Sequence, residues 1–285
     1  MKDYFNYVGK TCVVTGGSNG MGKATVEMLL DLGAKVYNLD LVPGDIAGME
    51  YIQVNLTERE SIDKAFEKLP PTIDKFFGVA GIVGVGPGQT AELVVKINFL
   101  SYKYMLDNYL FDRMAWGGAI AFITSGACRG WITQKHEYFP MIHASYDWAL
   151  EFIRANEQNM DPVGSYAISK RALACIIAAK SEKYYEKEIR INNVMPGHTK
   201  TGLLEGVVKF MGSDDFMHNY FGVIKRESLP EEIASLLVFV NSDLASFVTA
   251  ATISGEGGLM TLCDLGVRTD INGGAFFKGP VLFPK

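Results

Sequence analysis

The chain has 285 residues, enough for one large α/β domain or two small ones with a full hydrophobic core. Hydrophobic residues make up 48% and charged residues 21%, as in soluble globular proteins, and a formal net charge of -5 argues against a surface devoted to nucleic acid. No apolar run reaches the roughly 18 residues of a membrane span, and the four cysteines are widely spaced, so we expect a cytoplasmic protein with reduced thiols, no signal peptide and no metal site.

A glycine-rich loop follows the first expected strand. The β-branched run 11–15 predicts a buried strand, and a helical pattern covers 23–32. In this context a loop can hold a pyrophosphate, because backbone N–H groups at the helix N-terminus face the phosphates. The alternative is an ordinary turn between strand and helix, which needs only one or two glycines. This loop contains four within seven residues: Gly16, Gly17, Gly20 and Gly22.

A carboxylate stands at the end of the second expected strand, 35–39. Asp40 follows the glycine loop by about 20 residues, the position from which a carboxylate accepts hydrogen bonds from the adenosine ribose. It would repel a 2′-phosphate, and no Arg or Lys follows directly, so we expect NAD rather than NADP. A solvated loop carboxylate is the alternative. A third strand over 51–54 places Asn55 and Leu56 near the adenine.

The middle of the chain continues the alternation of strands and helices. The expected elements are a helix over 57–69 that Thr57 caps, a strand over 75–79, a glycine-rich loop over 80–88, a helix from Thr90 to about Met114 and a strand over 118–124. The loop suits either close approach to a ligand or a flexible crossing. Asn98 lies within the apolar face of its helix, where it is either structural or holds a water. Ser125 ends the fifth strand.

A tyrosine and a lysine share one face of the helix expected over 165–185. Tyr166 and Lys170 are four residues apart, hence one turn from each other. A nearby ammonium favours the phenolate, so we expect the pKa of the tyrosine to fall from about 10 toward the range of a general acid or base. The alternative is a half-exposed helix face without chemistry. The 40 residues between Ser125 and Tyr166 are expected to form a surface insertion over about 128–163, with a helix near 145–156.

The last third completes the sheet. The expected elements are a strand over 189–194, a loop over 196–201, a mobile lid over about 200–222, a helix over 230–241, a strand over 247–254 and a C-terminal tail over 259–285. A peripheral pair of helices is the alternative to the lid. The pattern predicts an α/β fold, a single domain over 1–285 with a Rossmann-type doubly wound parallel sheet of about seven strands and helices on both faces. The nucleotide would lie at the carboxyl ends of the strands.

In order over about 8–260, the chain resembles the short-chain dehydrogenase/reductase family. The residues that carry the resemblance are Thr15, Gly16, Gly20, Gly22, Asp40, Ala80, Gly81, Asn98, Ile123, Thr124, Ser125, Tyr166, Lys170, Pro196, Gly197, Thr201, Gly257 and Gly258. The resemblance implies an NAD-binding set made of Gly16, Ser18, Asn19, Gly20, Met21, Asp40, Asn55, Leu56, Ala80, Gly81, Tyr166, Lys170, Pro196, Gly197, Thr199 and Thr201.

The resemblance also implies catalytic roles. Tyr166 would be the general acid/base on the substrate oxygen, and Ser125 would hydrogen-bond that oxygen. Lys170 would lower the pKa of the tyrosine and bind the nicotinamide ribose. Asn98 would anchor a water in a proton relay, and Thr199 and Thr201 would meet the carboxamide and phosphates. Hydride would pass between the nicotinamide and the substrate carbon.

Two departures from the family pattern stand out. The family usually has about a dozen residues between the catalytic serine and tyrosine, so the insertion here is unusually long and is similar to that of bacterial 3α-hydroxysteroid dehydrogenase/carbonyl reductases. It would cover a helix face that many relatives use to form tetramers, which leaves either a homodimer or a homotetramer possible. Asn55 replaces a frequent aspartate near the adenine, and an amide can donate and accept hydrogen bonds there.

The first hypothesis is therefore an NAD-dependent oxidoreductase that interconverts a secondary alcohol and a ketone, with a hydroxysteroid as substrate. The apolar residues of the expected lid support a large apolar substrate: Phe210, Met211, Phe216, Met217, Tyr220 and Phe221. A carbonyl reductase or alcohol dehydrogenase for another substrate, such as a sugar derivative or an acyl chain, is the second hypothesis. A nucleotide-binding protein without turnover is the third, and the serine–tyrosine–lysine set argues against it.

Overall fold

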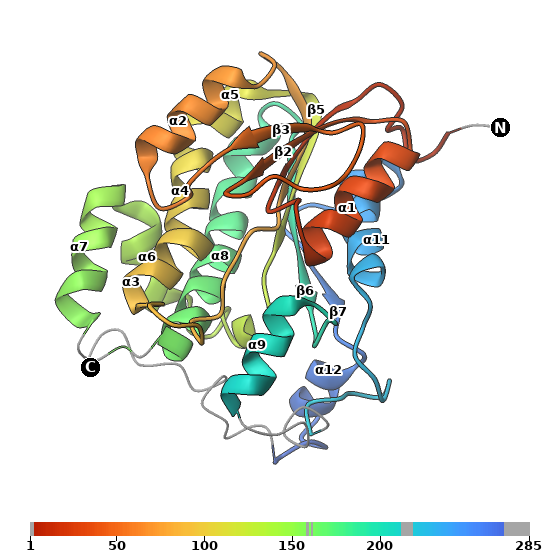
Figure 1. Cartoon of the computed structure of the whole chain (residues 1–285). Helices are drawn as coiled ribbons and strands as arrows, with labels where there is room; N and C mark the ends of the chain where they lie inside the picture. The colour runs from red at the N-terminus through yellow and green to blue at the C-terminus, as the bar shows by residue number, and fades with distance from the viewer. Residues whose placement is uncertain (1–2, 158–159, 161, 212–218, 271–285) are drawn as a thin grey trace.

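One parallel sheet of seven strands forms the centre of the molecule (Figure 1). The computed structural model describes residues 3–157, 160, 162–211 and 219–270. The strand order is β3-β2-β1-β4-β5-β6-β7. Their bounds are β1 Thr11–Thr15, β2 Lys35–Asp40, β3 Glu50–Gln53, β4 Ile73–Gly78, β5 Met114–Ile123, β6 Arg190–Pro196 and β7 Thr252–Gly255. The predicted Rossmann-type α/β class is confirmed.

The strand order places a crevice at one edge of the sheet. From β1 the chain builds outward through β2 to β3, and it then returns to add β4 on the other side of β1. The connection after β1 and the connection after β4 therefore run in opposite directions across the sheet. This divergence leaves an opening beyond the carboxyl ends of these two strands. All seven residues of β6 are buried, as expected for a strand covered on both faces.

Two helical layers cover the sheet (Figure 1). Helices α1 (Gly20–Asp31) and α11 (Pro230–Asn241) lie together on one face. Helices α2 (Arg59–Lys68) and α8 (Pro162–Tyr185) belong to the layer on the other face. The sequence predicted all four helices, although Glu58 rather than Thr57 is the N-cap residue of α2. Each layer encloses its own apolar core against the sheet.

The long helix predicted from Thr90 to about Met114 contains two π-helical turns. Its successive parts are α3 (Ala91–Val95), η1 (Lys96–Leu100), α4 (Ser101–Met105), η2 (Leu106–Leu110) and α5 (Phe111–Arg113). Thr90 caps it, because its side chain accepts a hydrogen bond from Leu93 N–H at 3.1 Å. Met114 belongs to β5, which therefore begins earlier than predicted. The first π turn contains Asn98, and such turns often occur at functional sites.

The insertion forms two helices, α6 (Lys135–His143) and α7 (Tyr146–Asn156). They pack outside α3 and α8 (Figure 1). The sequence predicted α7, but α6 was missed because Pro140 lies inside it. Three polar contacts join the insertion to the underlying helices: Lys103 Nζ donates to Ile142 O (3.1 Å), Arg59 pairs with Asp147 (3.0 Å) and Arg154 pairs with Glu92 (3.0 Å).

The C-terminal part differs from the prediction in two respects. Strand β7 begins at Thr252, five residues later than predicted, and Phe247 is fully exposed. The expected tail contains a short helix, α12 (Leu259–Asp264). The expected lid region begins with α9 (Gly202–Met211), whereas Phe216 and Met217 lie outside the described residues.

The composition also raised the questions of membrane spans, metal sites and the state of the cysteines. Within the described ranges, no helix is both long and apolar enough to cross a membrane. The same ranges contain no cluster of three His, Cys, Asp or Glu side chains arranged for a metal ion. The four cysteines are buried free thiols: Cys12, Cys128, Cys175 and Cys263.

Candidate active site

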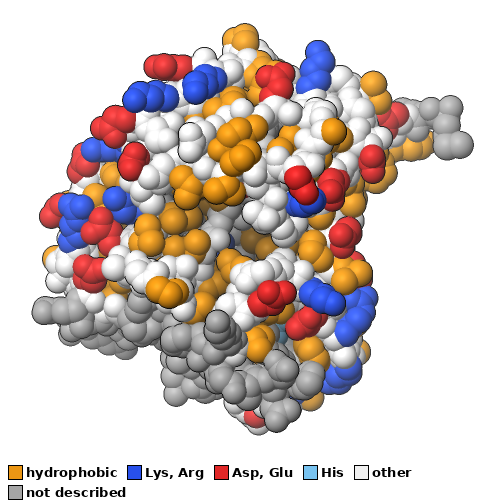
Figure 2. All heavy atoms as spheres, in the orientation of Figure 1, with side chains coloured by type: hydrophobic (Ala, Val, Ile, Leu, Met, Phe, Trp, Pro, Cys, Tyr) orange, Lys and Arg blue, Asp and Glu red, His pale blue; other side chains and the backbone are white. Residues whose placement is uncertain are grey.

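Two adjoining pockets form one groove along the carboxyl ends of the strands. The first extends from the glycine loop to Asp40 and Asn55, and the second from Ser125 to Met260. They share the wall residues Met21, Val79, Gly81, Ile82, Thr201 and Leu203. Figure 2 shows the groove as a hollow in the middle of this face, bordered by hydrophobic side chains. A ligand could therefore extend from the end of β2 to the end of β5.

The glycine loop has the geometry of a dinucleotide cradle. Gly16 has φ +73° and Gly20 has φ +53°, in the left-handed region that favours glycine. A Cβ on Gly22 would lie 2.0 Å from Gly16 O, so no side chain fits there. The loop leads into the N-terminus of α1, whose free N–H groups and dipole attract phosphates. The residues present therefore fit the pyrophosphate of a dinucleotide.

Asp40 lies at the end of β2, where it lines the groove. Its carboxylate accepts hydrogen bonds from Ser18 N–H (3.0 Å) and Leu41 N–H (2.7 Å), which hold it beside the glycine loop. Ser18 itself points away from the groove, because its hydroxyl donates to Val42 O (2.7 Å) and accepts from Asn38 Nδ2 (2.9 Å). The predicted Ser18 thus braces the loop with its side chain and does not line the groove.

Asn55 and Leu56 were expected to lie near the adenine. Both residues line the same pocket as Asp40. The amide of Asn55 is largely used within its own turn, since it donates to Glu58 (2.8 Å) and accepts from Thr57 N–H (3.1 Å). The other predicted residues that line this pocket are Gly16, Asn19, Gly20, Met21, Ala80, Gly81 and Thr201.

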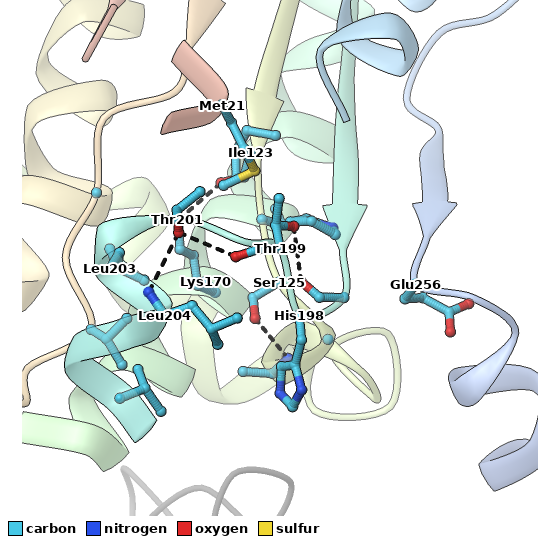
Figure 3. A pocket seen from close by; sticks show the side chains of 18 of the residues that line it. Met21, Ile123, Ser125, Lys170, His198, Thr199, Thr201, Leu203, Leu204 and Glu256 are labelled. Carbon is cyan, nitrogen blue, oxygen red and sulfur yellow. Dashed lines mark hydrogen bonds between the residues drawn. The ribbon is translucent and has the colours of Figure 1, made fainter. Parts of the chain in front are cut away.

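Ser125, Tyr166 and Lys170 meet on one wall of the second pocket (Figure 3 shows Ser125 and Lys170). Ser125 follows β5, and its hydroxyl accepts a hydrogen bond from Ala127 N–H (3.2 Å). The ammonium of Lys170 donates to Ile123 O (3.0 Å) and lies 5.7 Å from the centre of the Tyr166 ring. The buried face of α8 thereby brings the tyrosine and lysine to the end of β5.

Burial, rather than the lysine, dominates the protonation of this pair. Burial raises the pKa of Tyr166 to about 12, and the Ser125 hydroxyl offsets only part of this rise. Burial also lowers the pKa of Lys170 to about 8. The predicted fall in the tyrosine pKa is therefore wrong in this structure, because desolvation disfavours the charged form of both groups. The ring of Tyr166 is only half-buried, so water in the groove screens part of the effect.

Asn98 joins the groove wall to the helix that carries the tyrosine. Its side-chain oxygen accepts from Ile82 N–H (2.9 Å), and its amide nitrogen donates to Ile82 O (2.8 Å) and Ser169 Oγ (3.2 Å). Both amide hydrogens are thus used, which supports the structural alternative for this side chain. The backbone of Gly81 lies alongside, because a Cβ there would be 3.0 Å from Asn98 Oδ1 and 3.4 Å from Lys170 Nζ.

The loop after β6 closes the groove between its two ends. Pro196, Gly197 and Thr199 line the second pocket, and Thr201 lines both. The hydroxyls of Thr199 and Ser228 are 2.9 Å apart, and the hydroxyl of Thr201 donates to Thr199 O (3.2 Å). A Cβ on Gly20 would lie 3.2 Å from the Thr201 methyl group, so this loop approaches the glycine loop directly.

The sequence interpretation missed several walls of the second pocket. Its far wall comes from α12, through Leu259 and Met260, and from His198 and Glu256. By contrast, α9 belongs to the region that was expected to form a lid, and it lines the pocket through Leu203, Leu204 and Val207. The apolar residues Leu259, Met260 and Cys263 have the spacing of one face of a helix, which was the available signal. The helix was missed because this short segment was assigned to the C-terminal tail. No described residue of the insertion lines either pocket.

Two family models match consecutive parts of the chain. A model described as short chain dehydrogenase matches residues 10–138, and one described as enoyl-(acyl carrier protein) reductase matches residues 149–260. The coniferyl-alcohol dehydrogenase of Pseudomonas sp. strain HR199 is 27% identical over 88% of this chain and 96% of its own. The 3-alpha-hydroxysteroid dehydrogenase/carbonyl reductase of Comamonas testosteroni is 25% identical over 87% of this chain and 95% of its own.

Solved structures share the fold. The 3-alpha-hydroxysteroid dehydrogenase from Pseudomonas sp. B-0831, solved with NADH, superposes with a TM-score of 0.77 at 22% identity, over 90% of this chain and 99% of its own. BdcA, solved with NADPH, superposes with a TM-score of 0.67 at 22% identity, over 89% of this chain and 95% of its own.

Proposed function

Because the chain belongs to the short-chain dehydrogenase/reductase family, whose members are NAD(P)-dependent oxidoreductases of alcohols and ketones, we propose that it interconverts a secondary alcohol and a ketone with NAD and that its substrate is a hydroxysteroid. One observation carries the chemical part of this proposal. Ser125, Tyr166 and Lys170 share a wall of an apolar pocket that is continuous with the dinucleotide groove.

Each residue of the site has its own role in the proposed reaction. The bound nicotinamide supplies or takes up the hydride. Tyr166 exchanges a proton with the substrate oxygen, and Ser125 donates a hydrogen bond to that oxygen. Lys170, held by its hydrogen bond to Ile123 O, would bind the ribose of the nicotinamide. Asn98 holds Ile82 and Ser169 in place around them.

The apolar lining supports a hydrocarbon-rich substrate. Aliphatic side chains contribute much of the lining of the second pocket, and its polar residues include Ser125, Tyr166 and His198. Such a pocket gains its affinity from apolar burial and its orientation from few hydrogen bonds. Relatives act on substrates as different as coniferyl alcohol and a 3-alpha-hydroxysteroid. A non-steroid alcohol is therefore the second candidate, supported by the slightly higher identity to the coniferyl-alcohol enzyme.

The test of this function is a substrate panel. Purified protein is assayed by NADH and NADPH absorbance with hydroxysteroids, aryl alcohols and simple secondary alcohols. We expect turnover of 3α-hydroxysteroids with a kcat/KM at least about 10-fold above that for simple alcohols, because each buried CH₂ contributes about 0.8 kcal/mol. Turnover of non-steroids alone would overturn the steroid assignment, and no turnover of any alcohol would overturn the reaction.

Cofactor choice rests on Asp40. In this position a carboxylate can pair with ribose hydroxyls and repels a 2′-phosphate. We expect Asp40→Asn, which keeps an acceptor for Ser18 N–H, to lower the preference for NAD over NADP by about 10- to 100-fold in kcat/KM. Asp45→Asn is the matched control, since Asp45 is an exposed carboxylate paired with Lys23 outside the groove. A wild type that already prefers NADPH would contradict this role of Asp40.

We also propose a homodimer or homotetramer. The helices α6 and α7 cover the outer side of α3 and α8, so the contact between subunits would use other surfaces. We place the subunit contact on the surface around α11 and β7, because exposed apolar residues lie there: Phe239, Leu244 and Phe247. Light scattering of the purified protein measures the subunit number.

A further inference from the structure

His198 is a polar side chain of the apolar pocket to which the proposed reaction gives no role. It follows Gly197 in the loop after β6. Its carbonyl accepts from Ser228 N–H (2.9 Å), which fixes the backbone at this point. Figure 3 shows the imidazole beyond Ser125, on the side of the pocket away from Met21. It thus lies where the body of a substrate would extend away from the nicotinamide.

The ring is packed but not satisfied by hydrogen bonds. Its centre is 5.7 Å from that of Tyr220. The nitrogen Nδ1 is buried and has no hydrogen-bond partner among the described residues. Buried polar atoms are nearly always hydrogen-bonded, and each exception calls for an explanation. A phenylalanine would fill the same space without this cost, so packing alone does not account for a histidine here.

The imidazole is neutral. Burial lowers the pKa of His198 to about 4, far below neutral pH. A neutral imidazole has one N–H donor and one lone pair, and the protonated nitrogen can be either one. A hydroxyl both donates and accepts, so in either tautomer it can pair with Nε2, the ring nitrogen that is not among the buried unpartnered atoms of the described residues. A carboxylate only accepts, so it could pair with only one of the two tautomers.

We propose that His198 binds a second hydroxyl of the substrate, distinct from the oxygen that reacts at Ser125 and Tyr166, so that the enzyme selects neutral apolar alcohols with two hydroxyls. This inference rests on the proposed function. The pocket gives the two contacts different tasks: Ser125 and Tyr166 hold the reacting oxygen, and His198 fixes the orientation of the substrate body. Because this contact exists both before and during the reaction, its loss raises KM more than it lowers kcat.

The test uses matched pairs of substrates that differ by one hydroxyl. One pair is a steroid with a single 3α-hydroxyl and the same steroid with a further hydroxyl on its D ring. The other pair is cyclohexanol and cyclohexanediol. We expect the wild type to prefer the dihydroxy partner of at least one pair by about 10- to 100-fold in kcat/KM. His198→Phe should bring this ratio close to one, mainly through KM.

Three further variants complete the experiment. His198→Gln carries a donor and an acceptor to about the position of Nε2 and should keep most of the preference. His198→Leu replaces the phenylalanine variant if a thermal melt shows that the latter is unfolded. His143→Phe is the matched control, since His143 is exposed on α6, outside the pocket.

The outcomes separate the two proposals. A wild-type ratio near one for both pairs, or an unchanged ratio in His198→Phe, would overturn the role of His198 while leaving the reaction intact. Absence of turnover for all four alcohols would overturn the proposed function and, with it, this inference. If His143→Phe also loses the preference for the dihydroxy substrate, the specific role of His198 is overturned.

Discussion

Tyr166→Phe should lower kcat for alcohol oxidation and ketone reduction by about 10²- to 10⁴-fold, the range expected for loss of a general acid or base, or about 3 to 5.5 kcal/mol. The phenyl ring keeps the packing of α8 against the pocket, and only the hydroxyl is removed. Tyr166 lines the second pocket and not the glycine-loop pocket. The affinity for the dinucleotide should therefore change little, which fluorescence titration with NADH measures.

The pH dependence provides a second readout of the same variant. Alcohol oxidation needs the phenolate, and burial raises the pKa of Tyr166 to about 12. The rate of oxidation should thus rise with pH up to that pKa, whereas ketone reduction uses the phenol that predominates below it. In Tyr166→Phe the rise of the oxidation rate with pH should disappear.

Tyr185→Phe is the matched control for Tyr166→Phe. Tyr185 is on the same helix and is 57% exposed, far from the groove. Its replacement should leave kcat unchanged. Full activity in Tyr166→Phe would mean that the proton is exchanged elsewhere, and Ser125 would then need a different role.

The sequence predicted the parts of the site that strand order brings together. Gly16 follows β1, Asp40 ends the adjacent strand β2, and Ser125 comes after β5 of the same parallel sheet. Their convergence at the carboxyl ends of the strands therefore required only the alternation of strands and helices. The spacing of Tyr166 and Lys170 placed both on one helix face. These inferences depend on local pattern and on a general rule of sheet topology, which is why they could be made without coordinates.

The rest depends on tertiary packing. The raised pKa of Tyr166 could not be predicted because it comes from burial of the hydroxyl, which the spacing of residues does not show. The helix α12 contributes Met260 to the pocket from a region that resembled a tail. Its six residues are too few for a clear helical period. Pro140 concealed α6 for a different reason, since proline inside a helix usually ends it.

The insertion was predicted from the number of residues between Ser125 and Tyr166. Its length predicted a surface element, and α6 and α7 indeed pack on the outside of α3 and α8. Two roles are open to the insertion: the assembly of subunits and the specificity for the substrate. Since none of its described residues lines the groove, a direct contact with the substrate is not among its observed roles. The apolar pocket is instead lined by residues of α9 and α12 and by His198.

Gly22→Ala should weaken dinucleotide binding by at least about 100-fold, or ~2.7 kcal/mol. The reason is steric: the new Cβ would lie 2.0 Å from Gly16 O and 2.7 Å from Gly16 C, both backbone atoms that cannot rotate away. The loop must open to relieve this contact, and its N–H groups then no longer point at the phosphates. Fluorescence titration with NADH gives the change in Kd.

The same contact should reduce stability, because Gly22 is buried at the start of α1. We expect the free energy of unfolding to fall by about 1–3 kcal/mol, as for other overpacked sites. Gly206→Ala is the matched control, since a Cβ there meets only Val85, at 4.0 Å, and alanine is the better helix former. An unchanged Kd in Gly22→Ala would contradict the assignment of this loop to the pyrophosphate, even if stability fell, because a loop that can open without loss of affinity does not hold the phosphates through its backbone.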